Sequence, residues 1–373
     1  MKRSQLILGL IVLAVLAALG AYAQHRYKFD WNEVATQLAK ANWTKISIAV
    51  GCIYLAYAFR SARWAFLLRH MKKVGPFSLL GTQVMGFTAI ALIGRVADPV
   101  RPYLVSKKTE IPLANQLAVY IVERLFDMGT MALIFSIAML WIPTADIMKA
   151  TSHSRSFASL GATHPLLASI LVRYSGLVFT LLGALFLLVA RFSGDFIADF
   201  FERSLGVVSK KLGHSIGQKI RAFRAGLGAM QSLGDLAVVC SLSLAMWLLI
   251  ACAYFVCCRA FVASQQLATI TPQKCVLLMI ASGGASVMQL PVLGWFTQII
   301  AVAAVLSAGF GVAKEAATAS AATLLFVTFI SIIPVGLIWA HFEHVSLRKV
   351  TIESEHAEED LAATAPADQN VSP

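Results

Sequence analysis

Charged residues are scarce in this chain of 373 residues, and their scarcity excludes a soluble globular protein. Only 13% of the residues are Asp, Glu, Lys or Arg, whereas soluble domains carry about 25%. Hydrophobic residues reach 58%, and the mean hydropathy is +0.74. Several apolar runs approach the roughly 20 residues that a helix needs to cross the hydrocarbon core of a bilayer. The composition therefore predicts an all-α integral membrane protein with many spans.

Patterns that indicate catalysis, cofactor binding or metal binding are also missing. The sequence contains no Walker loop, no GxSxG motif and no Ser/His/Asp arrangement. Its six cysteines form no CxxC pair, and no histidine lies between His214 and His341. His341 and His344 lie three residues apart at the end of the last apolar run, without further ligands, and are interpreted as interfacial. We expect no metal and no cofactor, and we expect the cysteines to pack as small hydrophobic residues.

Nine apolar runs are candidate membrane segments, and the charges between them predict their orientation. The runs cover residues 6–23, 46–59, 77–93, 125–142, 170–190, 236–258, 275–293, 295–313 and 316–340. Loops 60–76 and 191–235 are rich in Lys and Arg and are therefore predicted to be cytoplasmic. The net charge of +12 is interpreted as loop charge facing an anionic membrane surface and not as nucleic-acid binding.

The run 77–93 cannot cross the membrane once, because the same charge argument places both 60–76 and 95–112 in the cytoplasm. We therefore expect it to enter the membrane and return as a re-entrant segment, with Pro99 and Pro102 disfavouring continuous helix on the way out. The first run fits a cleavable signal peptide or a retained helix, and the many later spans favour the retained helix. The prediction is about eight transmembrane helices plus one re-entrant segment in the inner (cytoplasmic) membrane, with both termini cytoplasmic.

Three parts of the chain are distinguished by composition. Residues 1–348 are predicted to form one polytopic membrane domain, and the acidic residues 349–373 have little to bury and are predicted to be disordered. Within the domain, residues 194–232 repeat apolar positions every three or four residues, which is typical of an interfacial amphipathic segment. The alternative is a loop helix that packs on the bundle and has no lipid role. The basic residues proposed to meet anionic lipid are Lys210, Lys211, Lys219, Arg221 and Arg224.

Charged residues inside the apolar part of the chain are the candidate site. Glu123, Arg124 and Asp127 lie ten or more residues into a predicted helix at 113–142, where ionisable groups are costly, usually paired and often functional. The stretch before that helix carries further charges. The proposed headgroup residues are Arg95, Asp98, Arg101, Glu123, Arg124 and Asp127. Arg95 and Arg101 would bind lipid phosphate, because the planar guanidinium matches phosphate oxygens. Glu123 and Asp127 would hold Arg124 and the loop arginines, and could meet a cationic headgroup. The alternative is a structural charge-pair lock that holds the re-entrant segment.

The segment "GRVADPVRPYLVSKKTEIPLANQLAVYIVERLFDM", residues 94–128, resembles the hallmark of the lysylphosphatidylglycerol synthase transmembrane-region family. These are flippase-like proteins, and they include the membrane domain of the multiple peptide resistance factor. The two arginines of that hallmark match Arg95 and Arg101, and Asp98 stands where the family has glutamate. The family's "ERLLD" helix matches "ERLFD" at 123–127.

The second signature of the family, Pro-x-x-Gly-Gly-x-Gly followed by a glutamate, is only partly present. Pro291 and Gly294 match it, but Trp295 replaces the second glycine and Gln298 stands near the expected acid. This departure puts the usual chemistry of that half in doubt. Pro99 and Pro291 anchor a faint internal repeat, which would fit the inverted repeats of secondary transporters.

The resemblance implies a flippase-like protein that translocates or binds a phospholipid or another amphipathic lipid. The alternative is a membrane-embedded transferase that adds an aminoacyl or glycosyl unit to a lipid, or a non-catalytic partner subunit of one. In the family, aminoacyl transfer resides in a separate soluble domain, and this sequence contains none, so we expect no catalysis by this chain alone. The expected partners are membrane lipids, above all anionic phospholipids, and a synthase or transferase.

Overall fold

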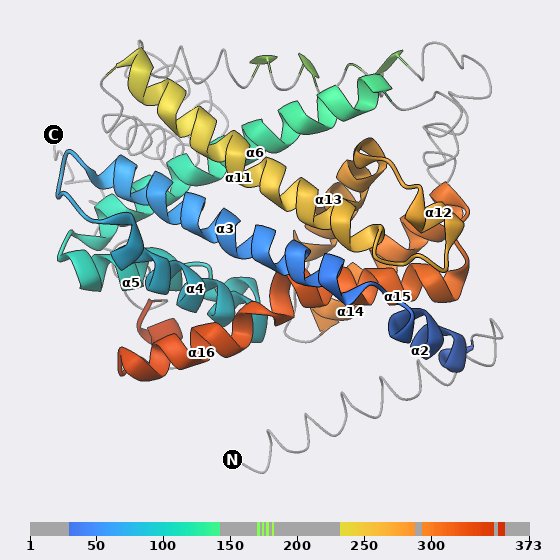
Figure 1. The fold of residues 1–373 in the computed structure, drawn as a ribbon. Helices are drawn as coiled ribbons and strands as arrows, with labels where there is room; N and C mark the ends of the chain where they lie inside the picture. Colours follow the sequence, from blue (N-terminus) through green and yellow to red (C-terminus); the bar gives the residue numbers. More distant parts are fainter. Residues whose placement is uncertain are drawn as a thin grey trace, which may run out of the picture.

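The computed structural model describes residues 30–141, 232–287, 293–346 and 350–354, together with seven residues between 170 and 182. All secondary structure in these residues is helical, and long helices run across the molecule (Figure 1). Four features predicted from the sequence lie outside the described residues. They are the first apolar run, residues 194–231 of the amphipathic segment with its five basic residues, Pro291 and the end of the acidic tail. The all-helical fold predicted from composition is confirmed for the described part of the chain.

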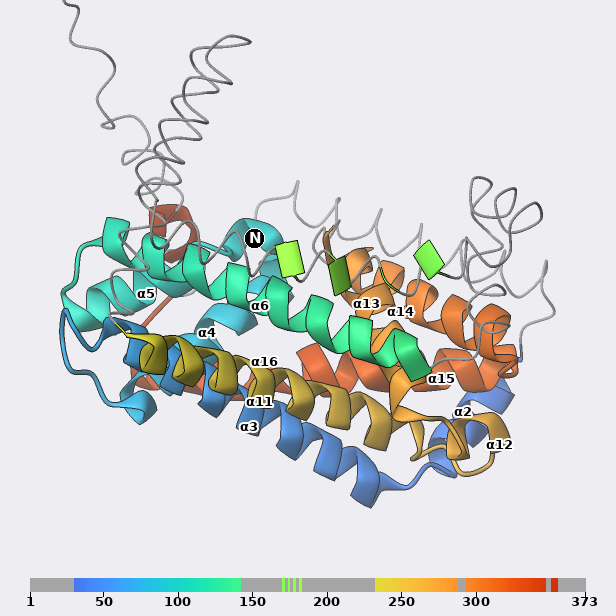
Figure 2. The same cartoon turned by 90° about the horizontal axis from the view of Figure 1, so that it is seen from above.

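Two long helices, α3 (Trp43–Leu68) and α11 (Leu233–Cys258), lie antiparallel to each other. At one end the backbone N–H of Asn42 donates to the carbonyl of Ala260, at 2.8 Å. At the other end Arg69 Nη2 lies 2.5 Å from Asp235 Oδ2. Ser232 caps α11, and its hydroxyl and Asp235 form a capping box that satisfies free N–H groups of the first turn. Figure 1 shows them side by side across the middle of the molecule, and Figure 2 shows that α3 lies on one outer side of the bundle with α11 next to it.

After α3 the chain forms a helical hairpin from α4 (Pro76–Ile93) and α5 (Val100–Thr109). The turn passes through Gly94, whose φ of 93° favours glycine, and a short 3₁₀ helix at 95–97. Lys72 Nζ, in the loop before α4, donates to the carbonyl of Thr109 at the end of α5, at 2.9 Å. The hairpin therefore returns the chain to the end from which it started.

The predicted break at both prolines is wrong for Pro102. The break falls at residues 94–99, and Pro102 lies in the first turn of α5. A proline is tolerated there because the N–H groups of the first helical turn have no intrahelical acceptor.

The next helix, α6 (Leu113–Trp141), is 29 residues long and matches the predicted helix at 113–142. The second half repeats this order after α11. A short α12 (Gln265–Ala268) leads to α13 (Pro272–Val287) and α14 (Leu293–Ala304), and α14 continues as a π-helical turn at 305–309. The helix α15 (Lys314–Leu325) passes through a second π-helical turn at 326–330 into α16 (Ile332–Phe342). Among the described residues, each half thus contains a long helix, a pair of shorter helices and a second long helix.

Three stretches of the described residues are long and apolar enough to cross a membrane by themselves: Pro76–Ile93, Leu233–Cys258 and Lys314–Phe342. The helices α3 and α6 are as long as these, but they carry the buried charges described below. The hairpin and α16 approach closely, because a Cβ at Gly81 would overlap Trp339 and one at Gly336 would overlap Thr88. Such small residues allow close packing between helices in membranes.

The predicted disorder from residue 349 is wrong for residues 350–354. These residues are helical, and Val350, Thr351 and Ser354 are buried. Val350 packs in one apolar cluster with Val100 of α5, which gives this part of the tail a surface to bury. A short helix near the N-terminus, α2 (Trp31–Ala39), packs on α15 at the opposite end of the molecule (Figure 1).

Candidate functional site

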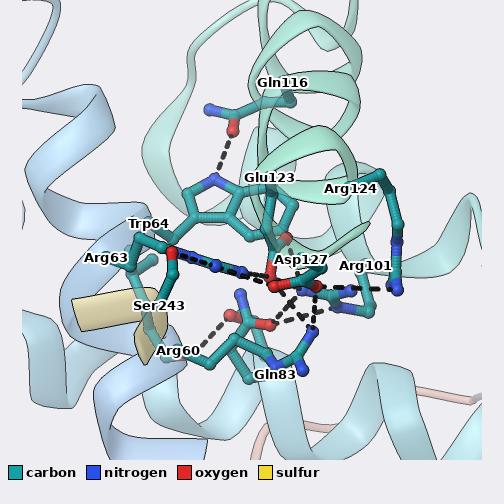
Figure 3. Close-up of polar contacts among 12 residues, drawn as sticks. Arg60, Arg63, Trp64, Gln83, Arg101, Gln116, Glu123, Arg124, Asp127 and Ser243 are labelled. Carbon is teal, nitrogen blue, oxygen red and sulfur yellow. Dashed lines mark hydrogen bonds and ion pairs between the residues drawn. The ribbon is translucent and has the colours of Figure 1, made fainter. Parts of the chain in front are cut away.

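Two carboxylates one turn apart on α6 form the centre of a buried ion-pair network. Glu123 accepts from Arg63 Nη2 at 2.8 Å, Arg101 Nη2 at 2.8 Å and Arg60 Nη1 at 3.2 Å. Asp127 accepts from Arg63 Nη1 at 2.8 Å and Arg60 Nη1 at 3.4 Å. Figure 3 shows both arginines of α3 pointing toward these two carboxylates. Their spacing of four residues puts the carboxylates on one helix face, and the matching arginines lie three residues apart on α3.

The hairpin supplies the third arginine of this network. Arg101 is fully buried, and its Nε and Nη2 donate to Gln83 Oε1 of α4 at 3.1 and 2.8 Å. Its guanidinium carbon lies 4.5 Å from the ring centroid of Phe87 and 5.1 Å from that of Trp64. A Cβ at Gly86 would overlap the Arg101 side chain, so a glycine is required where α5 crosses α4. Hydrogen bonds and aromatic rings therefore hold this guanidinium on several sides.

The helix α11 completes the network from the second half of the chain. Arg63 Nη1 donates to the hydroxyl of Ser243 at 2.7 Å, and the indole N–H of Trp247 donates to Asp127 Oδ1 at 3.3 Å. Ser243 is itself fully buried. The first and second halves of the chain thus share one polar network.

We call Arg60, Arg63, Arg101, Glu123, Arg124 and Asp127 the arginine cluster. Four arginines and two carboxylates leave an excess of two positive charges (four minus two). Three buried guanidinium nitrogens of this cluster have no hydrogen-bond partner among the described residues: Arg63 Nε, Arg101 Nη1 and Arg124 Nε. Both carboxylates are occupied by arginine, and no group of His, Cys, Asp and Glu in the described part of the chain could hold a metal ion. The cluster is therefore suited to bind an anion.

The six residues singled out in the sequence do not share one environment. Arg101, Glu123 and Asp127 lie together at the centre of the cluster. Arg124 lies at its edge, where its side chain is 33% exposed and its Nη1 is 3.9 Å from Asp127 Oδ2. Asp98 is partly buried and acts electrostatically on Arg124. The main chain of Arg95 lies in the 3₁₀ turn, and its side chain is not among those described.

Sequence reasoning missed Arg60 and Arg63, which it counted as charges of a cytoplasmic loop at 60–76. The structure corrects this assignment, because α3 continues to Leu68 and buries both side chains, at 7% and 1% exposure. One feature of the sequence could have found them. The run 46–59 is shorter than the roughly 20 residues of a membrane span, so the helix had to continue through the two arginines.

In the second half, Gln298 lies in α14 and reaches a different polar group. Its Nε2 donates to the hydroxyl of Ser282 in α13 at 2.6 Å, and the hydroxyl of Tyr254 in α11 donates to the same oxygen at 2.9 Å. All three side chains are buried, with exposures of 2% to 4%. Gly294, also predicted from the second signature, is buried in the first turn of α14.

Long apolar helices with an ion-pair network buried between them define a polytopic α-helical membrane protein. The chain belongs to the family described as the lysylphosphatidylglycerol synthase TM region, whose model matches residues 6–336. This match confirms the family indicated by the sequence. No curated protein and no solved structure matches the chain. Family membership and the apolar helices establish a multi-pass membrane protein related to lipid modification or transport.

Proposed function

We propose that this protein is a flippase-like transporter that binds the phosphate of an amphipathic lipid in the arginine cluster and moves the lipid between leaflets of the cytoplasmic membrane. The observation that carries the proposal is the positive excess of the cluster, together with its buried N–H groups that lack acceptors. A phosphodiester brings one negative charge and several acceptor oxygens. Arginine binds such groups through a planar fork of donors, even where little water is present.

The carboxylates have a definite role in this proposal. In the absence of lipid, Glu123 and Asp127 neutralise part of the charge of the arginines, which would otherwise be costly at this depth in a membrane. An arriving phosphate would compete with them for the same N–H groups. Because one anion replaces another, the arginines are never left without a partner, and the headgroup exchanges water for protein donors.

The proposed transport route follows from two similar halves of opposite orientation. The similar order of helix lengths, the antiparallel pairing of α3 with α11 and the pair of shorter helices in each half support this reading. Inverted repeats with broken helices are common in secondary transporters. The helix α13 contains 16 residues, and α14 with its π-helical continuation contains 17 (12 plus 5), both below the roughly 20 residues of a full span. These lengths support a second re-entrant hairpin in place of two of the eight predicted spans.

Orientation is proposed from the basic residues at the end where the first hairpin begins. Lys72, Lys73, Lys107 and Lys108 lie there, and the positive-inside rule assigns that end to the cytoplasm. With this orientation both termini are cytoplasmic, and residues 194–232 would lie on the anionic inner leaflet. Labelling of Asp98→Cys in a cysteine-free protein tests the topology, since labelling from the outer face alone would contradict a hairpin that enters from the cytoplasm.

Transport is tested with the purified full chain in liposomes that contain a fluorescent phospholipid. A membrane-impermeant quencher then reports the rate at which lipid moves between leaflets. We expect faster exchange than in protein-free liposomes, and we expect Arg101→Gln to slow it. The matched control is Arg69→Gln, at the partly exposed end of α3, where the arginine pairs with Asp235 outside the cluster. Exchange no faster than in empty liposomes, across several headgroups, would refute the proposal.

A further inference from the structure

The polar group of the second half contains a buried acceptor that nothing in the described residues satisfies. We call Tyr254, Ser282 and Gln298 the neutral trio. Tyr254 and Gln298 both donate to the Ser282 hydroxyl, and Gln298 Oε1 is buried without a hydrogen-bond partner among the described residues. Buried acceptors are normally paired, and leaving one unpaired is unfavourable. An unpaired carbonyl oxygen in a membrane transporter therefore indicates a place for a donor from a ligand.

The surroundings of the trio decide which kind of donor fits. Residues 272–309 contain only one charged residue, Lys274, and no acid. Lys274 lies over the ring of Phe310, with Nζ 5.0 Å from the ring centroid. A cationic headgroup at the trio would therefore meet no carboxylate from α13 or α14, and an ammonium group without a partner is costly in a membrane. A hydroxyl group supplies a donor without a charge.

One face of α11 connects the trio to the arginine cluster. Ser243 contacts Arg63, Trp247 contacts Asp127, and Tyr254 belongs to the trio. At about 100° per residue, the three α11 side chains lie within about 40° of one another around the helix. Tyr254 lies about 16 Å from Ser243 along the helix axis. A small headgroup cannot touch both ends at once, so the trio lies further along a route that begins at the cluster.

We infer that the neutral trio is a second headgroup contact that accepts a hydrogen bond from a lipid hydroxyl, and that the substrate is a phospholipid with an uncharged, hydroxylated headgroup. This inference rests on the proposed function and deepens it. The arginine cluster selects the phosphate, and the trio selects against an ammonium group. The uncharged side chain of Gln298 accounts for this selectivity.

The test compares three fluorescent lipids in liposomes that contain the full-length protein. Phosphatidylglycerol presents hydroxyl donors on an uncharged headgroup, phosphatidylcholine presents a quaternary ammonium group without a hydrogen-bond donor, and lysyl-phosphatidylglycerol presents ammonium groups that can donate. We expect phosphatidylglycerol to exchange fastest. Gln298→Met removes the free acceptor and should lower its rate relative to phosphatidylcholine by about fivefold, the effect of one modest hydrogen bond. Tyr254→Phe removes one of the two hydrogen bonds donated to Ser282 and should lower this rate by a smaller factor. Gln298→Glu should shift the preference toward the cationic lipid.

A matched control is Tyr54→Phe, because the Tyr54 hydroxyl donates to the carbonyl of Ser331, at 2.9 Å, outside the trio. This variant should leave the preference unchanged. Thermal unfolding of each variant separates a change in selectivity from loss of the fold, and Gln298→Met keeps the test valid if Tyr254→Phe fails to fold. The inference is overturned if the cationic lipid exchanges fastest. It is also overturned if the folded trio variants keep the wild-type preference for phosphatidylglycerol over phosphatidylcholine while Arg101→Gln still slows the exchange of all three lipids. If no lipid exchanges at all, the proposed function fails and this inference fails with it.

Discussion

Replacing Arg101 by glutamine removes one positive charge from the arginine cluster and keeps a hydrogen-bond donor near Gln83. A phosphate about 5 Å from a guanidinium, at an effective dielectric constant of about 20, interacts with it by about 3 kcal/mol. Loss of that interaction corresponds to roughly a hundredfold weaker binding of an anionic lipid. The variant should therefore slow leaflet exchange strongly when lipid is below saturation.

The same substitution should leave the protein folded. Glu123 retains Arg63 at 2.8 Å and Arg60 at 3.2 Å when Arg101 is removed, so its carboxylate is not left alone. The loss of stability should stay below the roughly 3–5 kcal/mol of a buried pair that loses its only partner. Thermal unfolding in detergent, followed by size-exclusion chromatography, measures this directly.

A charge series separates the effect of charge from that of structure. Arg101→Gln lowers the positive excess of the cluster from two to one, Glu123→Gln raises it to three, and the double variant restores two. Binding of an anionic lipid, measured by fluorescence in detergent, should weaken in the first variant and strengthen in the second. The double variant should lie between them. If both single variants change the affinity in the same direction, the electrostatic explanation is refuted.

Three further predictions concern positions outside the charges themselves. Gly86→Ala should displace Arg101, because the new Cβ would overlap the Arg101 side chain, and should therefore slow lipid exchange in the liposome assay without changing any charge. The control is Gly283→Ala, whose new Cβ would point into open space and should leave the exchange rate unchanged. Glu353→Gln removes the negative charge that pairs with Lys107 of α5. Because this pair is partly exposed, the change should cost less than about 1 kcal/mol, but it should make the C-terminal segment more accessible to limited proteolysis. Ser232→Ala removes the cap of α11 and should lower the free energy of unfolding by about 1 kcal/mol, measured by thermal unfolding; an unchanged unfolding temperature would contradict the capping role.

Local pattern and composition were sufficient for several features of this protein. The low share of charged residues required a membrane environment, because so many apolar side chains cannot be buried in a soluble domain of this size. The charges of the loops indicated that the chain returns between residues 77 and 112, and the structure places a helical hairpin there. The four-residue spacing of Glu123 and Asp127 placed both on one face of α6, since helix geometry depends only on nearby residues.

Only the tertiary structure decided which residues those carboxylates meet. Arg60 and Arg63 have the same sequence character as the loop lysines that follow them, and burial between α3, α6 and α11 is what distinguishes them. Likewise, nothing near Gln298 in the sequence indicated Tyr254, which lies 44 residues earlier in the chain and meets it through Ser282. Ion pairs and hydrogen bonds between distant segments depend on how helices pack, and the pattern along one helix carries no information about its neighbours.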